Sequence, residues 1–351
     1  MKIVIPLLSL EHHGGIRDII EIANYLAEKR HRVIIYVPED RFKTHYNISK
    51  KVIIRKVKKS GRGFTKLLGV LMWYMFYLEK ADLYIANFFP TFYPVFIKSF
   101  FAHTPFVYFV QDIETKFVKF PLNIFAFLTY LIPSKKITLS GFIKNALKDK
   151  DAHVASAGVS SEFLELPLSK RSYKMPLVIG HIYRKEHLKN SKLFMQALPS
   201  ILEAGFHVII VGDGKKISQR HKNLTIIPYG NSTYLRDNFY DKIDIFVHTS
   251  YIEGFGLPPL EAMARGCVVM LTQSGGPKEY AKKNNVIFID KYNPMDITEK
   301  LLRFSKQPDI LKEISKNAIK EAKKHPLSHI GIAFEQALKN QGLLYWQTKN
   351  Y

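Results

Sequence analysis

The chain has 351 residues, a length that favours two domains over one, and its hydrophobic content of 47% argues against disorder. The single cysteine, Cys267, excludes an internal disulfide and a cysteine-rich zinc site. Because 52 basic side chains outnumber 30 acidic ones, the net charge is +22. Such a charge favours a polyanionic partner, namely nucleic acid, anionic lipid or a phosphorylated substrate, unless it serves only solubility.

The first half of the chain alternates between strand and helix patterns. Apolar runs predict strands over 2–8, 32–37, 51–57, 81–86, 105–110 and 136–139. The glycine turn Gly14-Gly15 precedes an amphipathic helix over 16–29. The first run is interpreted as a core strand and not as a signal peptide, because no small-residue cleavage site follows it. This rhythm is typical of a parallel sheet covered by helices on both faces.

Three apolar and aromatic segments, 67–78, 88–102 and 120–133, stand out in this half. They fall short of the roughly 20 residues that a membrane-spanning helix needs. Lysines flank them (Lys66, Lys80, Lys116, Lys119, Lys135 and Lys136), and 50–66 holds eight basic residues and no acid. Core packing explains each segment taken alone, whereas together they favour interfacial contact with an anionic membrane surface.

The alternation restarts in the second half. Strands are predicted over 177–182, 207–211, 224–227, 243–248 and 267–271, with helices over 190–204 and much of 300–336. The polar segment 167–176, bracketed by prolines, marks the boundary between a domain of residues 1–166 and one of residues 167–351. Ligands of such folds bind at the carboxyl ends of the strands, and two similar halves are expected to leave a cleft between them.

The most informative segment is 251–266, with the sequence YIEGFGLPPLEAMARG. It follows a buried strand and places Glu253 and Glu261 eight positions apart, on a glycine-bearing loop and a helix that starts near Pro258. The N-terminus of a helix carries unpaired N–H groups and partial positive charge, which suits an anion or a sugar. Taken alone, the two carboxylates suit metal binding or hydrolysis equally well.

In its context, HTSYIEGFGLPPLEAMARGCVVMLTQSGGPKEY, the segment resembles the donor site of retaining GT-B glycosyltransferases of family 4. The hallmark of that family is two glutamates separated by seven residues within an EGFG…LEAMA.G pattern. GGIRDIIEIANYLAEKRHRVIIYV resembles the family's first glycine turn and helix, and YFVQDIETKF is similar to a subset that includes rhamnosyltransferases of surface-polysaccharide synthesis. The resemblance implies an α/β protein of two doubly wound Rossmann-like domains facing a cleft, with the last 20 or so residues crossing back to the first domain.

The resemblance also implies roles for individual residues. Glu253 acts on the donor sugar as a catalytic residue, and Glu261 accepts hydrogen bonds from the ribose hydroxyls. The backbone amides of the loop reach sugar hydroxyls or phosphate oxygens; these are Gly254, Phe255, Gly256 and Leu257. The nucleotide base is expected near the strand ends of the second half, where Gly212-Asp213-Gly214 and the segment 228–231 are candidates and Tyr229 would border the base; plain turns explain both segments equally well.

The family supplies an arginine just after the first glycine of the second half and a lysine several residues on. Here Gly180 fits the glycine, but His181 occupies the arginine position. We expect Arg184 to take the place of the arginine and Lys189 to be the second cation, with Lys185 as an alternative phosphate contact.

In the first domain, the family carries a histidine after the strand that precedes the acceptor loop. Here the matching positions are Gln111-Asp112, so Asp112 becomes a catalytic candidate for acceptor or sugar contact. Gly15 lets the first loop approach the diphosphate. His12 and His13 are either acceptor-site groups or plain surface residues.

These features predict a metal-independent hexosyltransferase that needs no cofactor beyond its nucleotide-sugar substrate. We recognise no metal-binding constellation in the sequence that is typical of metal-dependent transferases. The first domain would bind a glycan or lipid-linked acceptor of the cell envelope, and the protein would be cytoplasmic and peripheral on the inner membrane face. The alternatives are a basic nucleic-acid-binding protein, for which no recognition motif is visible, and a nucleotide-sugar binder that transfers nothing.

Overall fold

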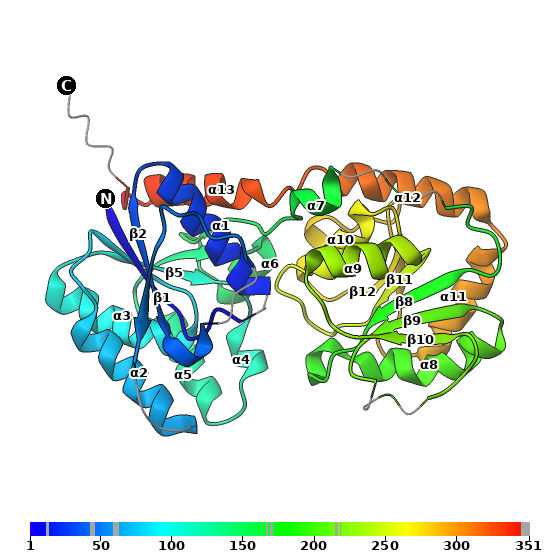
Figure 1. Ribbon diagram of the computed structural model, residues 1–351, viewed down its shortest axis with the longest axis horizontal. Helices are drawn as coiled ribbons and strands as arrows, with labels where there is room; N and C mark the ends of the chain where they lie inside the picture. The colour runs from blue at the N-terminus through cyan, green and yellow to red at the C-terminus, as the bar shows by residue number, and fades with distance from the viewer. Residues whose placement is uncertain are drawn as a thin grey trace. The chain divides into compact units, whose positions relative to one another are not determined.

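The computed structural model describes residues 1–11, 14–42, 46–58, 63–165, 168, 171–214, 217 and 219–344. The chain divides into two compact units (Figure 1). Unit 1 comprises Met1–Ala157 and Ser328–Tyr351, and unit 2 comprises Gly158–Leu327. The boundary that we placed after residue 166 therefore falls within unit 2, and 166–167 and 169–170 of the surrounding segment lie outside the described residues.

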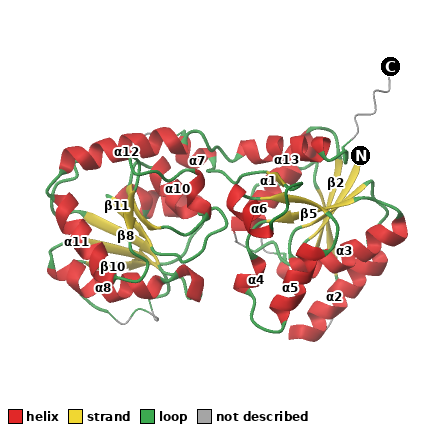
Figure 2. Cartoon of the chain, turned by 180° about the vertical axis from the view of Figure 1, so that it is seen from behind, coloured by secondary structure: helices red, strands yellow, loops and turns green. Residues whose placement is uncertain are grey.

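Unit 1 contains a seven-stranded parallel sheet in the order β3-β2-β1-β4-β5-β6-β7. The strands are β1 (Lys2–Pro6), β2 (Arg32–Pro38), β3 (Ile53–Val57), β4 (Leu83–Ala86), β5 (Phe106–Val110), β6 (Lys135–Thr138) and β7 (His153–Val154). Apart from Lys2 and Arg32 at their starts, the central strands β1, β2 and β4 are apolar and buried, because helices cover both faces of the sheet (Figure 2).

Helices α1 (Gly14–Glu28) and α13 (Ser328–Asn340) cover one face of this sheet. The other face carries α2 (Gly63–Tyr77), α3 (Phe89–Ala102) and α5 (Leu122–Leu131). Shorter elements are η1 (Glu39–Arg41), α4 (Glu114–Phe117) and α6 (Gly141–Leu147). The predicted return of the last helix to the first domain is observed, since α13 packs against α1 and the Tyr25 hydroxyl donates to Glu335 at 2.9 Å.

Unit 2 repeats the plan with a six-stranded parallel sheet in the order β10-β9-β8-β11-β12-β13. The strands are β8 (Val178–Ile182), β9 (His207–Val211), β10 (Leu224–Ile227), β11 (Ile245–His248), β12 (Val268–Thr272) and β13 (Ile287–Ile289). Helices α8 (Ser191–Glu203) and α11 (Pro294–Ser305) pack together on one face, and α10 (Leu257–Ala264) and α12 (Pro308–Ala322) on the other. Shorter elements are α7 (Ser161–Leu164), η2 (His187–Lys189), α9 (Ser232–Asn238), η3 (Tyr240–Lys242) and η4 (Gly276–Glu279). Both units are doubly wound, as predicted.

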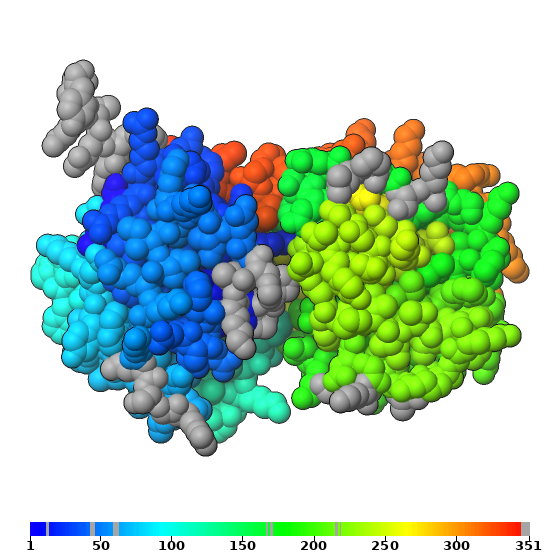
Figure 3. Space-filling model, viewed as in Figure 1, coloured from blue at the N-terminus to red at the C-terminus, as the bar shows by residue number. Residues whose placement is uncertain are grey.

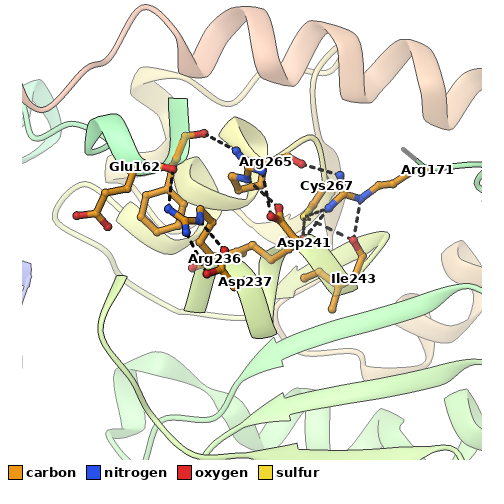
Figure 4. Close-up of polar contacts among 10 residues, drawn as sticks. Glu162, Arg171, Arg236, Asp237, Asp241, Ile243, Arg265 and Cys267 are labelled. Carbon is orange, nitrogen blue, oxygen red and sulfur yellow. Dashed lines mark hydrogen bonds and ion pairs between the residues drawn. The ribbon is translucent and has the colours of Figure 1, made fainter. Parts of the chain in front are cut away.

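A buried arginine cluster explains why the start of unit 2 packs where it does (Figure 4). The Arg265 side chain is only 1% exposed, and its guanidinium donates to both carboxylate oxygens of Asp241 at 2.8 and 3.0 Å and to the Phe163 carbonyl at 3.2 Å. Arg171 donates to the carbonyls of Tyr240, Ile243 and Arg265. These bonds join α7 and the following segment to η3 and the end of α10, so residues 158–165 belong to unit 2.

Unit 1 contains a buried carboxyl group shortly after β5. Glu114, at the start of α4, accepts the backbone N–H of Phe89 at 2.9 Å and the hydroxyl of Tyr108 at 2.8 Å. Burial raises the pKa of Glu114 to about 8, although these two hydrogen bonds oppose the shift. The folded protein therefore holds a proton that the unfolded chain releases at lower pH.

This proton links the stability of unit 1 to pH. Between the ordinary value of 4.5 and about 8, the folded state binds more protons than the unfolded state, so stability falls as pH rises. We expect the urea-unfolding free energy of the wild type to fall over this window and Glu114→Gln to remove part of the fall, on the order of a few kcal/mol. The exposed Glu39→Gln variant is the control, and equal slopes for wild type and Glu114→Gln would contradict the assignment.

Candidate functional site

Three loops meet at the carboxyl ends of the central strands of unit 2. They follow β8, β11 and β12, and backbone hydrogen bonds join them. The Tyr251 N–H donates to the Leu188 carbonyl at 2.8 Å, and the Glu253 N–H donates to the Ser274 carbonyl at 2.7 Å. In a doubly wound sheet this edge is where ligands bind. The loop after β11 carries Glu253 and leads into α10, which carries Glu261.

Glu253 is a buried carboxylate surrounded by donors. Its Oε2 accepts a hydrogen bond from Nζ of Lys189 at 2.9 Å, and its Oε1 accepts one from the Ser250 hydroxyl at 2.6 Å. Nε2 of His248 lies 3.1 Å from Oε1. Burial alone would raise the pKa of Glu253, but the charge of Lys189, with His248 and Ser250, holds it well below its ordinary value. Glu253 is therefore an ionised group inside the protein.

Glycines allow the loop after β11 and the loop after β12 to approach each other closely. A Cβ atom at Gly276 would lie 2.3 Å from the carbonyl oxygen of Gly254, so only glycine fits there. Gly256 has a φ of +87°, and its carbonyl accepts the hydroxyl of Tyr280. The Phe255 ring is buried and packs against Tyr280 at 5.6 Å between ring centroids. Phe255 therefore anchors the loop with its side chain, and only its backbone is available to a ligand.

The N-terminus of α10 is a weaker anion site than the sequence suggested. The helix begins at Leu257, and Pro258 and Pro259 occupy its next two positions. Proline has no N–H, so two of the four donors that a helix start normally offers are missing. Gly256, at the N-cap, and Leu257 keep theirs. The preceding glycine loop must then supply most of the backbone donors.

Glu261 lies in the second turn of α10 and is mostly buried. The hydroxyl of Tyr240 donates to its Oε2 at 2.9 Å. Asp241, next to Tyr240 in η3, holds Arg265 at the end of the same helix. Sequence reasoning missed Tyr240, because no motif marks η3. Its only signal is a tyrosine-aspartate pair shortly before the apolar strand.

His181 occupies the position of the expected arginine and is a neutral core residue. Its ring stacks on Phe194 with centroids 4.3 Å apart, Nδ1 lies 2.9 Å from the Val247 carbonyl oxygen, and Nε2 lies 3.2 Å from the Ser191 hydroxyl. Burial lowers the pKa of His181 to about 3. It therefore supplies no positive charge at neutral pH.

The structure gives the expected cations different partners. The Arg184 guanidinium is exposed and lies 4.8 Å from the centroid of the Tyr229 ring, a cation–π distance. Tyr229 is 44% exposed, and its hydroxyl donates to the Tyr183 carbonyl. Lys189 instead lies with Glu253, whereas Lys185 is exposed. Arg184 and Tyr229 together, and Lys189 with Glu253, thus form two groups within unit 2.

The two predicted residues of unit 1 lie near one another in that unit. Gly15 is in the first turn of α1, where a Cβ atom would lie 2.6 Å from Oε1 of Gln111. Asp112 follows Gln111 after β5 and accepts the N–H of Ile113 at 2.8 Å. Oε1 of Gln111 is buried and has no hydrogen-bond partner among the described residues. Roles in donor or acceptor binding for Gly15 and Asp112 remain predictions, and His12 and His13 lie outside the described residues.

Within the part of the chain that the structure describes, no three histidine, cysteine, aspartate or glutamate residues form a group that could hold a metal. No helix of that part is long and apolar enough to cross a membrane.

Comparison with known proteins finds similarity to glycosyltransferases, strongest in unit 2. Residues 165–324 match the family model described as glycosyl transferases group 1. An uncharacterized glycosyltransferase of Methanocaldococcus jannaschii is 28% identical over 201 residues, which cover 54% of this chain and 55% of that protein. A poly(glycerol-phosphate) alpha-glucosyltransferase of Bacillus subtilis is 24% identical over 181 residues, covering 49% and 26%. The chain spans about half the length, or less, of the curated relatives that it matches.

Solved structures share the fold of the whole chain. A sucrose-phosphate synthase from Thermosynechococcus elongatus has a TM-score of 0.80 at 12% identity and covers 97% of this chain and 99% of its own. The Anabaena protein HepE, in complex with UDP and glucose, has a TM-score of 0.77 at 18% identity and covers 98% and 100%. The predicted GT-B fold is confirmed, and residues 165–324 within it match the group 1 glycosyltransferase family model.

The contact between Lys189 and Glu253 generates a stability prediction. We expect Lys189→Met to lower the unfolding free energy by about 1–3 kcal/mol, because it leaves a buried carboxylate without its cation. The loss is expected to be largest at pH 7 and smaller below the ordinary glutamate value of 4.5, where protonation removes the charge. Urea unfolding at pH 7 and pH 4 measures it.

Lys185→Met, which removes an exposed lysine four positions earlier, is the matched control. The double variant Lys189→Met, Glu253→Gln is expected to recover part of the loss, since no uncompensated charge remains. A Lys189→Met protein as stable as the control at pH 7 would show that the pair does not carry the charge of Glu253.

Proposed function

We propose that this protein is a retaining glycosyltransferase of family 4 that moves a hexose from a nucleotide-sugar donor to an acceptor hydroxyl. The observation that carries the proposal is Glu253, an ionised carboxylate held by Lys189 on a glycine loop at the carboxyl ends of the strands. The group 1 match over residues 165–324 supports the same class of reaction.

Each group of the site suits one part of a nucleotide sugar. Glu253 orients hydroxyls of the donor sugar, and Glu261, held by Tyr240, accepts hydrogen bonds from the ribose. Tyr229, which is 44% exposed, is placed to border the base. Arg184, Lys189 and the amides of the glycine loop stabilise the diphosphate as it leaves, which is the largest electrostatic demand of such a reaction. The mechanism we propose is a front-face displacement without a bound metal.

We infer a uridine nucleotide sugar as the first donor to test, because HepE binds UDP and glucose in a structure of the same fold. A cell-envelope glycan or lipid-linked acceptor is supported by the resemblance of the Bacillus subtilis relative, a poly(glycerol-phosphate) alpha-glucosyltransferase. With such an acceptor the protein would act in the cytoplasm, at the inner face of the membrane. The rhamnosyltransferase-like similarity of YFVQDIETKF makes deoxyhexose nucleotides the second set of donors to test.

Conservative variants of the two glutamates separate catalysis from binding. Glu253→Gln keeps the shape of the side chain and the acceptor for Ser250, and we expect at least a hundredfold loss of transfer with nucleoside diphosphate binding retained. Glu261→Gln is expected to weaken nucleotide binding by about tenfold, because one charge-assisted hydrogen bond to the ribose is lost. Titration calorimetry with UDP and a product assay measure the two quantities.

Glu299→Gln, a change at an exposed position of α11 outside the donor-site segment, is the control and should alter neither quantity. Transfer at the wild-type rate by Glu253→Gln would overturn its role. Tight UDP binding by the wild type without transfer to any acceptor would identify a nucleotide-sugar binder instead.

A further inference from the structure

Helix α5 of unit 1 reverses the usual pattern of a surface helix, because its small residues are buried and its large apolar residues are exposed. In its sequence, LNIFAFLTYL, the buried residues are the small Ala126 and Thr129. The large apolar side chains point outward, with Phe127 52% exposed and Leu131 62% exposed. A helix that meets water on its outer face normally carries polar side chains there. The outer face of α5 therefore does not suit water.

Helix α2 shows the same inversion. Only Val70 and Tyr74 of its fifteen residues are buried, while Phe64 is 69% and Phe76 59% exposed. Phe101, at the end of α3, is 75% exposed.

Helix α3 joins the other two into one surface. The Tyr93 hydroxyl donates to the Phe125 carbonyl of α5 at 2.6 Å, and Nζ of Lys98 donates to the Phe76 carbonyl of α2 at 3.3 Å. The three helices lie side by side (Figures 1 and 2), and Figure 3 shows the atoms of α3, in cyan, adjoining those of α2, in blue. We call this surface the α2–α3–α5 face. Contiguous apolar surfaces of this kind mark interaction sites.

The charge around the α2–α3–α5 face indicates its partner. Helices α2, α3 and α5 contain no acidic residue, and the segment 116–135 contains none either. Exposed lysines border the face (Lys80, Lys116, Lys119 and Lys135). Lys116 also lines an open groove of about 350 Å³, whose other walls include Asn123 and Phe127. Apolar helices edged by lysine match the boundary between acyl chains and anionic headgroups.

We propose that the α2–α3–α5 face is the surface by which this protein docks on an anionic lipid bilayer. The outward side chains of α5 and α2 enter the boundary of the acyl region, and the flanking lysines contact the headgroup phosphates. The helices lie in the plane of the membrane, since none of the described helices is long enough to span it. Docking in this manner requires no glycosyl transfer, so it stands or falls independently of the proposed function.

Vesicle sedimentation of the full chain tests the proposal. We expect binding to vesicles of phosphatidylcholine with phosphatidylglycerol, and weaker binding to phosphatidylcholine alone or at high salt. The variant Ile124→Ser, Phe127→Ser, Leu131→Ser should bind at least tenfold more weakly. Lys116→Gln, Lys119→Gln, Lys135→Gln should lose binding chiefly to the anionic vesicles.

The matched control replaces three exposed apolar residues elsewhere, Leu302→Ser, Ile310→Ser and Ile332→Ser, and should bind as the wild type does. UDP binding by every variant shows that unit 2 has folded, and thermal unfolding checks unit 1. Equal vesicle binding by the α5 variant and the control would overturn the proposal. The proposal would also be overturned if the wild type did not bind vesicles but formed a dimer that the α5 variant cannot form. A second copy of the chain would then cover the α2–α3–α5 face.

Discussion

The ionised state of Glu253 is the constraint on which the site of unit 2 depends. A carboxylate removed from water keeps its charge only if cations and hydrogen-bond donors replace the lost hydration. Lys189 of η2 and Ser250 of the loop after β11 do so, and Nε2 of His248, at the end of β11, lies 3.1 Å from the carboxylate. Gly256 and Gly276 allow the loop after β11 and the loop after β12 to pack closely against each other next to the carboxylate. A site organised in this way has its charges fixed before any ligand arrives, which is the condition for electrostatic catalysis.

Much of this arrangement could be predicted because it rests on local patterns. Continuous apolar runs predict the buried parallel strands. The glycine loop before LEAMAR predicts the turn and the start of helix α10. The pair Glu253 and Glu261 could be singled out because of the EGFG…LEAMA.G pattern around it, since its spacing alone is a weak signal. The boundary between the units was harder to predict from the sequence. Prolines and polar residues indicate a linker, but the buried hydrogen bonds of Arg171 and Arg265 determine which unit the neighbouring segments pack against.

The features that escaped prediction depend on distant parts of the chain. Lys189 is 64 positions from Glu253, and Tyr240 meets Glu261 from a short turn without a motif. The neutral state of His181 comes from burial against Phe194, which a sequence does not show. The exposure of α5 could not be predicted either. The sequence of an apolar helix is the same whether its large side chains face a core or the outside. Only the placement of Ala126 and Thr129 against the protein separates the two cases.

The assignment of α13 to unit 1 has a consequence for the order in which the protein is made. Unit 2 is an insertion in the sequence of unit 1, whose last helix is synthesised after all of 158–327. On the ribosome, unit 2 can complete its fold while α1 still lacks its partner. Ile330, Phe334 and Leu338, all buried in the finished protein, arrive last. Domains generally fold as they emerge, so the N-terminal unit is here the one that finishes second.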